Sequence, residues 1–282
     1  MFPVEIKIVL PHNLTYLTLE YKTEGLIKYL QPVKLPATLK TFNLVIGGYQ
    51  DRCFTFSNIF GSELPPTLER LSFDIGYDIS THSNDIVYLD MELPETLKAL
   101  MVSKFVSIRK FPELPVGLEF FRLNHCRYEE PIEYLPQSLR FLEIDECEYS
   151  LVEKILEKLP YGLEFLSIKS TRPKYNKQII SLPPGLKYLG CELEAINWSE
   201  LPDTLRIIDL RQYYKDTLNL EMIDITGPLA PHIKWILCRP LQCAAYGVQS
   251  KSKIHIIPII YTGEIPIKTD SHLNNDWKIC LA

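Results

Sequence analysis

The stretch "LPQSLRFLEIDEC", residues 135 to 147, combines three features that decide the fold. A Leu-Pro pair opens it, an alternating apolar run over Leu139, Leu142 and Ile144 follows, and a cysteine closes it. The alternation is typical of a short strand whose apolar side chains share one face. Proline has no amide hydrogen and fixes its φ, so it suits a chain that arrives at a strand before strand pairing begins. The stretch therefore predicts one short strand with a defined start.

The same phrase recurs along most of the chain. Clear copies begin at Leu10, Leu35, Leu64, Leu93, Leu114, Leu135, Leu159, Leu182 and Leu201, and a worn copy begins at Leu229. The starts lie 19 to 29 residues apart, and self-similarity at such a period is the signature of a solenoid. Because the phrase runs through both halves, one elongated domain of about ten repeats is more economical than two compact domains.

The full phrase, from Leu139 to Cys147, is L-x-x-L-x-L-x-x-C, and Cys126 holds the last position in the preceding copy. This pattern resembles the leucine-rich repeat, and the resemblance covers residues 10 to about 241. It implies an α/β repeat solenoid, a right-handed leucine-rich-repeat horseshoe with short parallel strands on the concave face and irregular or short helical convex segments. The Leu-Pro opening is similar to the repeats of bacterial effectors and to FNIP-type repeats, although both have a stricter period.

The ends of the repeat array are expected to be capped, because a solenoid must cover its terminal repeats. We expect a leucine-rich-repeat solenoid over residues 1–241, with an N-terminal cap strand in "VEIKIVL" (Val4–Leu10). Residues 242–282 are expected to form a C-terminal cap, in which "KIHIIPIIYTGEIPIKT" (residues 253–269) resembles an edge strand.

The segments between the phrases differ from one another. "YSLVEKILEKLP" (Tyr149–Pro160) has apolar residues at helical spacing with charges between them, which predicts a short amphipathic helix. The long inserts at residues 45–63 and 74–92 are predicted to be irregular loops, and function often lies in such inserts.

Composition narrows the functional classes. The chain is 46% hydrophobic and 23% charged, which argues against a disordered chain, and its modest net charge of -5 argues weakly against a nucleic-acid partner. No apolar stretch approaches the ~20 residues of a spanning helix, and "MFPVEIKI" lacks the features of a signal peptide. We therefore expect an intracellular protein, cytoplasmic or nuclear, with no membrane partner.

The seven cysteines fit the same location. Their number is odd, and Cys126, Cys147, Cys191 and Cys238 fall inside the phrase, where buried free thiols behave as small hydrophobes. The spacing in "CRPLQC" would suit a metal clip, but no second pair completes it. We therefore expect no metal site and no cofactor.

Catalysis has little support in the sequence. The six histidines are scattered, and no nucleophile elbow, zinc-helix motif or glycine-rich phosphate loop is present. His125 next to Cys126 suggests a thiol with its base, but neighbouring strand residues face opposite sides and the repeat turns Cys126 inward. Glu146, on the next strand, is the expected neighbour of His125. We predict no catalytic residues and no enzyme activity.

The outward positions of the phrase define the candidate site. The position before each strand is charged in nine consecutive copies, which predicts a solvated rim at Lys40, Glu69, Lys98, Glu119, Arg140, Glu164, Lys187, Arg206 and Lys234. The next position carries aromatic residues in consecutive copies at Phe120, Phe141, Phe165 and Tyr188, and again at Trp235. Parallel strands lie about 4.8 Å apart, so the first four aromatics should form one continuous stripe. Such a stripe anchors a protein interface or merely stiffens the sheet.

Two charged columns lie beside the stripe. One holds Arg122 beside Glu143, and the next holds residues of alternating sign at Asp145, Lys169, Glu192 and Arg211. Lateral pairs of opposite charge either give specificity towards a partner or only align the strands. We predict a partner-binding site at Phe120, Arg122, Phe141, Glu143, Phe165, Tyr188 and Trp235.

These observations favour a protein-protein interaction scaffold that binds a protein partner through its concave surface. The resemblance to effector repeats, and to F-box-linked repeat proteins, implies an alternative: a substrate-recognition subunit that docks on a ubiquitin ligase made by another gene. A third possibility is a structural or inhibitory partner protein without any ubiquitin link.

Overall fold

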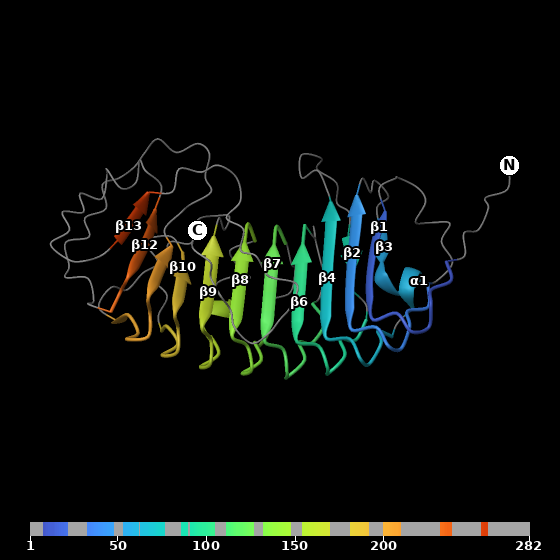
Figure 1. The fold of residues 1–282 in the computed structure, drawn as a ribbon, viewed down its shortest axis with the longest axis horizontal. Helices are drawn as coiled ribbons and strands as arrows, with labels where there is room; N and C mark the ends of the chain where they lie inside the picture. The colour runs from blue at the N-terminus through green and yellow to red at the C-terminus, as the bar shows by residue number, and fades with distance from the viewer. Residues whose placement is uncertain are drawn as a thin grey trace.

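The computed structural model describes residues 8–21, 33–47, 53–61, 63–76, 86–89, 91–104, 111–126, 132–147, 154–169, 181–191, 200–209, 232–238 and 255–258. Eleven strands of this part form one sheet in the order β1-β2-β4-β6-β7-β8-β9-β10-β11-β12-β13, and every pairing is parallel (Figure 1). The strands are β1 (Tyr16–Tyr21), β2 (Thr41–Gly47), β4 (Arg70–Gly76), β6 (Ala99–Ser103), β7 (Phe120–Asn124), β8 (Phe141–Asp145), β9 (Phe165–Lys169), β10 (Tyr188–Gly190), β11 (Ile207–Asp209), β12 (Trp235–Cys238) and β13 (His255–Pro258). The fold is a leucine-rich-repeat-like α/β solenoid, as predicted.

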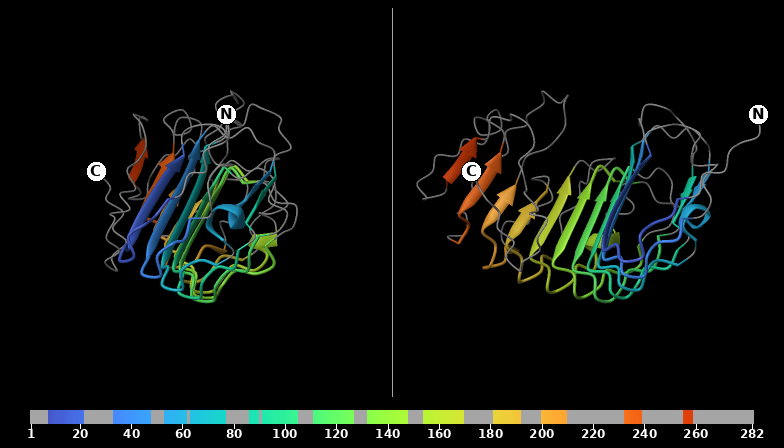
Figure 2. Two further views of the ribbon diagram at one scale, coloured as in Figure 1. Left: turned by 90° about the vertical axis from the view of Figure 1, so that its right-hand side faces the viewer. Right: turned by 45° about the vertical axis from the view of Figure 1, so that its right-hand side comes forward.

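The strand register follows the sequence phrase. Phe141 in β8 pairs with Phe120 in β7 and with Phe165 in β9, so equivalent residues of successive repeats lie side by side. A one-residue slip would turn every leucine out of the core, and the apolar alternation therefore specifies the register. Viewed near the long axis, α1 and the described segments that lead into the middle strands lie on one side of the main sheet, and we call the opposite face concave (Figure 2).

The core is a stack of leucines behind the sheet. The leucine just before each strand is 0% exposed at Leu39, Leu68, Leu97, Leu118, Leu139, Leu163, Leu186 and Leu205. Inside β8 the inward residues Leu142 and Ile144 are also fully buried. Each such side chain contributes about 1.5–3 kcal/mol through burial. The L-x-x-L-x-L prediction is confirmed.

The Leu-Pro pair begins a tight turn, which we call the leading turn. In eight leading turns the proline carbonyl accepts a hydrogen bond from the leucine amide three residues later, at 2.9 to 3.1 Å. The residue before that leucine is often Thr or Ser, and its hydroxyl contacts carbonyls of the preceding repeat. Thr67 Oγ1, for example, lies 2.9 Å from the carbonyl of Leu39 and 2.6 Å from that of Ala37. The same contacts recur at Thr38, Thr96, Ser138 and Thr204.

The two long inserts are not wholly irregular, so that prediction was wrong for part of them. The first contains β3 (Cys53–Thr55) and α1 (Phe56–Phe60), and the second contains β5 (Ile86–Tyr88), which pairs with β3 in a small parallel sheet. Phe56 and Phe60 are buried in the leucine core, each with its ring 5.2 Å from a sheet phenylalanine, Phe73 and Phe42 respectively. These rings fix the first insert because they fill the core behind β2 and β4.

The other predicted segments are described in part. Of Tyr149–Pro160, residues 154–156 are helical, Ile155 and Leu156 are buried, and residues 149–153 lie outside the described residues. Strand β13 lies within the late run predicted to be an edge strand. Residues 4–7 of the expected N-terminal cap lie outside the described residues, and the division near residue 241 stays a prediction.

Candidate functional site

The aromatic stripe forms as the register predicts. Ring centroids lie 4.1 Å apart for Phe120 and Phe141, 4.1 Å for Phe141 and Phe165, and 4.2 Å for Phe165 and Tyr188. Neighbouring rings deviate from parallel by only 7° to 9°. The strand spacing sets this stack, because each ring occupies the same position in its repeat.

The stripe is more deeply buried than an open sheet face suggests. Phe120, Phe141 and Tyr188 are 7%, 8% and 8% exposed, and Phe165 is half-buried. Ala99 joins Phe120 and Phe141 in one apolar cluster at the N-terminal end of the stripe. Because each inner ring has its two faces covered by neighbours, the stack stiffens the sheet, whether or not it also contacts a partner.

Arg122 and Glu143 form the predicted pair beside the stripe. The Arg122 Nε atom lies 3.1 Å from Glu143 Oε2, and its Nη2 donates to Glu143 Oε1 at 3.4 Å. The two side chains differ in access, since Arg122 is 40% exposed and Glu143 is 11% exposed. A two-point contact fixes the guanidinium plane, so the accessible part of Arg122 has a defined orientation.

A second ion pair crosses a whole strand, which the sequence did not reveal. Lys169 Nζ lies 3.0 Å from Asp209 Oδ2, and the Tyr188 hydroxyl donates to the same oxygen at 2.5 Å. Gly190 lies between the two partners, and a Cβ there would come within 3.0 Å of Ser167 Oγ and 3.3 Å of the Lys169 Cε. Because glycine has no side chain, it leaves room for the aliphatic part of Lys169 to cross β10.

The predicted column of alternating charges is therefore modified. Lys169 is the strand neighbour of Asp145, as expected, but its ammonium pairs with Asp209 of the adjacent column. Glu192 and Arg211 lie outside the described residues. One feature of the sequence could have indicated the Lys169–Asp209 pair: the small residues Ser167 and Gly190 precede Asp209 at the same position of successive repeats.

Asp145 is a carboxyl whose surroundings disfavour its charged form. Burial raises the pKa of its carboxyl to about 6, and the charges of Glu146 and Glu143 add to this effect against the opposing Lys169 and Arg122. Among the described residues, its buried Oδ1 atom has no hydrogen-bond partner.

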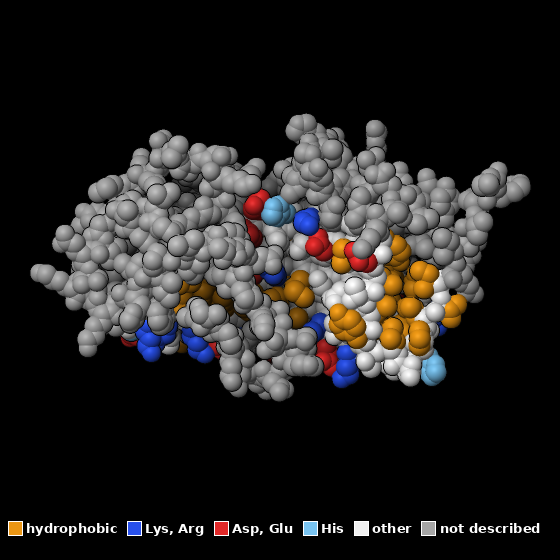
Figure 3. Space-filling view, turned by 45° about the horizontal axis from the view of Figure 1, so that its top comes forward, with side chains coloured by type: hydrophobic (Ala, Val, Ile, Leu, Met, Phe, Trp, Pro, Cys, Tyr) orange, Lys and Arg blue, Asp and Glu red, His pale blue; other side chains and the backbone are white. Residues whose placement is uncertain are grey.

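The strands β6, β7 and β8 are each followed by a left-handed residue: Lys104, His125 and Glu146 have φ of 60°, 53° and 49°. The amides of these residues donate to carbonyls of the next repeat, and His125 Nε2 lies 2.8 Å from Glu146 Oε2, as predicted. Figure 3 shows acidic, basic and histidine side chains gathered near the middle of the molecule. The backbone hydrogen bonds of Lys104, His125 and Glu146 stabilise the turns that follow these three strands.

Cys126 faces away from His125. Its sulfur lies 3.4 Å from the Val102 carbonyl and 3.3 Å from the Asn124 carbonyl, and Cys126, Cys147 and Cys191 are all buried. Burial raises the pKa of the Cys147 thiol well above its usual value, which opposes formation of a thiolate. The Cys126 sulfur thus contacts backbone carbonyls, while the ring of His125 contacts Glu146, so the described residues show no thiol–imidazole pair at Cys126.

The charged residues before the strands alternate in sign through most of the sheet and pair laterally. Lys40 and Glu69 lie 3.0 Å apart, Lys98 and Glu119 lie 3.5 Å apart, and Arg140 contacts Glu164. Lys187 Nζ lies 2.5 Å from the second oxygen of Glu164. Burial would raise the pKa of Glu164, but hydrogen bonds from Lys187 and Arg140 outweigh it and lower that pKa. These exposed pairs line the rim that the sequence predicted as solvated.

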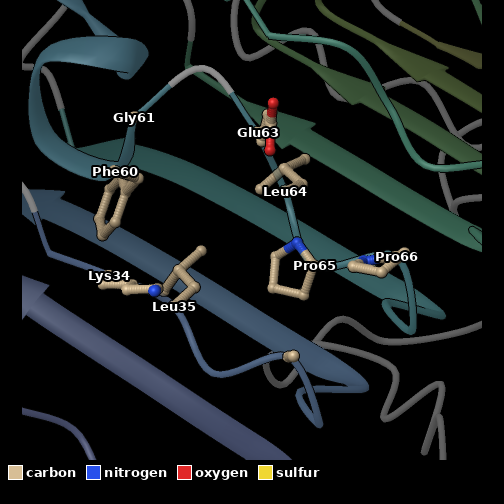
Figure 4. Close-up of a pocket in the computed structure, with 9 residues that line it drawn as sticks. Lys34, Leu35, Phe60, Gly61, Glu63, Leu64, Pro65 and Pro66 are labelled. Carbon is tan, nitrogen blue, oxygen red and sulfur yellow. The ribbon is translucent and has the colours of Figure 1, made fainter.

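An open pocket of about 360 Å³ lies apart from these columns (Figure 4). Its lining includes Leu35, Phe60 and Leu64, with Lys34 and Glu63 as its charged members. None of the predicted site residues lines it.

Trp235 is the remaining predicted site residue. Its backbone belongs to β12 and pairs with Ile207 in β11, but its side chain lies outside what the structure describes. The described part of the chain holds no cluster of three or more metal-ligating side chains, and no described helix has the length and apolarity to cross a membrane.

Comparison with known proteins adds little to this description. No protein-family model matches the chain, and no curated protein matches it. The solved structures that match include one described as the crystal structure of CroV588, a novel circular LRR protein structure, with 17% identity and a TM-score of 0.31. The match covers 83% of this chain and 41% of that chain. The fold assignment rests on the strand order and register of the molecule itself, which is a leucine-rich-repeat-like solenoid.

Proposed function

We propose that this chain is a non-enzymatic scaffold that binds a protein partner on its concave face, around β7, β8 and β9. The observation that carries the proposal is the fixed alignment of outward columns, in which rings at 7° to 9° from parallel lie beside the Arg122–Glu143 pair. A surface that is already ordered loses little conformational entropy when it binds, so more of the contact energy remains as affinity.

The chemistry of the face suits protein recognition. Aromatic residues and arginine are enriched at the energetic centres of protein interfaces. We propose that Phe165, the half-buried ring, and Arg122, the accessible cation, make the principal contacts. The nearly buried Phe120, Phe141 and Tyr188 would hold these two in place and contribute their ring edges.

Two finer proposals remain. The Leu-Pro phrase supports kinship with effector-type or FNIP-type repeats, and the odd number of cysteines, with several buried inside the phrase, supports an intracellular, reducing location. A substrate-recognition role would be supported if ubiquitin-ligase subunits copurified in constant ratio. A structural or inhibitory role would instead be supported by a single stoichiometric partner.

Site-specific cross-linking tests the binding face. The photoreactive residue p-benzoylphenylalanine replaces Phe165 in one variant and Tyr161, exposed on a leading turn, in the control. In the cell that expresses the chain, we expect the variant at Phe165 to cross-link a defined protein and the control at Tyr161 to leave that protein unlabelled. Equal labelling from both positions, or labelling from Tyr161 alone, would overturn the proposed binding face.

A further inference from the structure

Two outward side chains on neighbouring strands have unmet hydrogen-bonding capacity. Among the described residues, neither Asp145 Oδ1 nor Ser167 Oγ has a hydrogen-bond partner, although both atoms are buried. Ser167 is 1% exposed. A buried polar group without a partner costs free energy that a suitable ligand would recover.

Both side chains lie on the concave face of the sheet. Leu142, Ile144, Leu166 and Ile168 fill the core, so alternation turns Glu143, Asp145 and Ser167 to the opposite side. Ser167 pairs in register with Glu143, which places its hydroxyl diagonally across from Asp145. On the other side of Ser167, Gly190 contributes no side chain, and the Lys169 stem passes there on its way to Asp209.

The charges around these two groups leave a negative excess. Arg122 already contacts both oxygens of Glu143, and the Lys169 ammonium pairs with Asp209. Glu146 adjoins Asp145 in the chain and contacts His125. Asp145 is therefore the carboxylate of this group that forms no ion pair among the described residues, although Lys169 and Arg122 lie near enough to oppose the rise of its pKa.

We propose that Asp145 and Ser167 together receive a cationic side chain, the ammonium of a lysine or the guanidinium of an arginine, from the bound protein partner. This inference rests on the proposed function and names the partner chemistry that the same face selects. The carboxylate supplies the opposite charge and the hydroxyl supplies a second acceptor, so a group with several N–H donors satisfies both. The adjoining aromatic edges of Phe141 and Phe165 suit the aliphatic stem of such a side chain.

The titration of Asp145 supports this geometry. Its pKa is raised to about 6 by burial and by Glu146 and Glu143, against Lys169 and Arg122. A cation bound beside the carboxylate would favour the ionised form and lower that pKa. Binding should therefore weaken as the pH falls below about 6, where Asp145 becomes protonated.

The test uses the full chain labelled with carboxyl-¹³C aspartate, with the Asp145 resonance assigned by its loss in Asp145→Asn. The probes are n-butylammonium and n-butylguanidinium, with n-butanol and calcium chloride as neutral and metal controls. We expect a saturable shift of the Asp145 resonance with one or both cations, and no saturable shift with butanol or calcium. The relative strength of the two cations distinguishes a lysine from an arginine ligand.

Two variants separate a built site from general surface charge. Ser167→Ala removes only an unpartnered hydroxyl, so it should fold and should weaken the binding of the cation by about three- to tenfold. Glu95→Gln removes one charge from an exposed leading-turn position and should leave the affinity unchanged. Linear, unsaturable shifts, equal affinities for wild type and Ser167→Ala, or an equal response to calcium would each overturn the cation site. The proposed function would not fall with the cation site, because cross-linking from position 165 tests the binding face independently.

Discussion

The first two strands of the main sheet, β1 and β2, and the middle strands β7 to β9 share one core but present different outer faces. In β1 and β2 the outward residues include Tyr16, Thr18 and Asn43. Tyr16 and Thr18 are exposed and Asn43 is half-buried, and their side chains are joined by hydrogen bonds of 3.0 to 3.4 Å. In β7 to β9 the outward residues are stacked rings and ion pairs. The inward residues are apolar in both regions. The repeat therefore specifies the framework through its inner face, and the outer face is free to take on a function.

The largest expected effect comes from the shared inner face. Leu142→Asp should unfold the domain, with a loss of about 4 kcal/mol or more, because an unpaired charge would lie in the core. Thr18→Asp, on the exposed outer face of β1, should change the free energy of unfolding by less than about 0.5 kcal/mol. Urea unfolding followed by circular dichroism measures both, and a native-like midpoint for Leu142→Asp would disprove the register.

The next effect separates the two outer faces directly. Phe141→Ala should cost about 3–4 kcal/mol, because the ring is buried between two others. Tyr16→Ala removes an aromatic residue from the same column, but Tyr16 is exposed, and the loss should stay below about 1 kcal/mol. Chemical denaturation measures both variants. If Phe141→Ala and Tyr16→Ala lowered the free energy of unfolding equally, ring stacking would add nothing to the stability of the sheet.

A glycine in β10 tests the ion pair that crosses a strand. Gly190→Ala should cost about 1–3 kcal/mol, because its Cβ would press on Ser167 and the Lys169 stem. If Gly190→Ala destabilises the fold by displacing the Lys169 side chain, the losses in the free energy of unfolding for Lys169→Met and Gly190→Ala should be clearly non-additive in a double-mutant cycle. Additive losses would show that the glycine serves another contact.

Asp145→Asn should give a smaller, pH-dependent gain. The folded pKa is about 6 against a usual value of 3.8, so the folded state holds its proton more tightly and the wild type loses stability as pH rises from about 4 to 6. The variant should be more stable on the order of 2 kcal/mol at pH 7.5 and equal to wild type near pH 4. Asp74→Asn, in the same column but beside Lys104, should give no such gain. Melting curves measured from pH 4 to pH 7.5 test this prediction. A gain in stability of Asp145→Asn that did not depend on pH would refute the raised pKa of Asp145.

Sequence reasoning predicted what depends on side-chain alternation. The spacing of Leu139, Leu142 and Ile144 determined which residues are buried, and burial determined the register that aligns Phe120 with Phe141. The proline of the leading turn was also readable, because its missing amide hydrogen restricts where it can occur.

The remaining features depend on contacts that the repeat does not encode. The Lys169–Asp209 pair joins residues 40 positions apart across Gly190, so a search among adjacent repeats could not find it. Strands β3 and β5 are three residues each and lack a visible alternation, and the burial of Phe56 and Phe60, which anchors the first insert in the core, was not predicted. The Thr and Ser hydroxyls of the leading turns were visible in the sequence as a recurring LPxTL, but their carbonyl partners lie in the preceding repeat.

The central claim is that the outer face of β7 to β9 recognises a protein partner while the inner face only maintains the fold. The most direct measurement is the cross-linking yield from p-benzoylphenylalanine at position 165, compared between otherwise wild-type protein and Arg122→Glu, with Lys40→Glu on the charged rim as control. We predict that Arg122→Glu abolishes the cross-linked product in protein that circular dichroism shows to be folded at the assay temperature, whereas Lys40→Glu, which likewise reverses the charge opposite a glutamate, preserves it. Undiminished cross-linking in Arg122→Glu, or equal loss in both variants, would contradict the account.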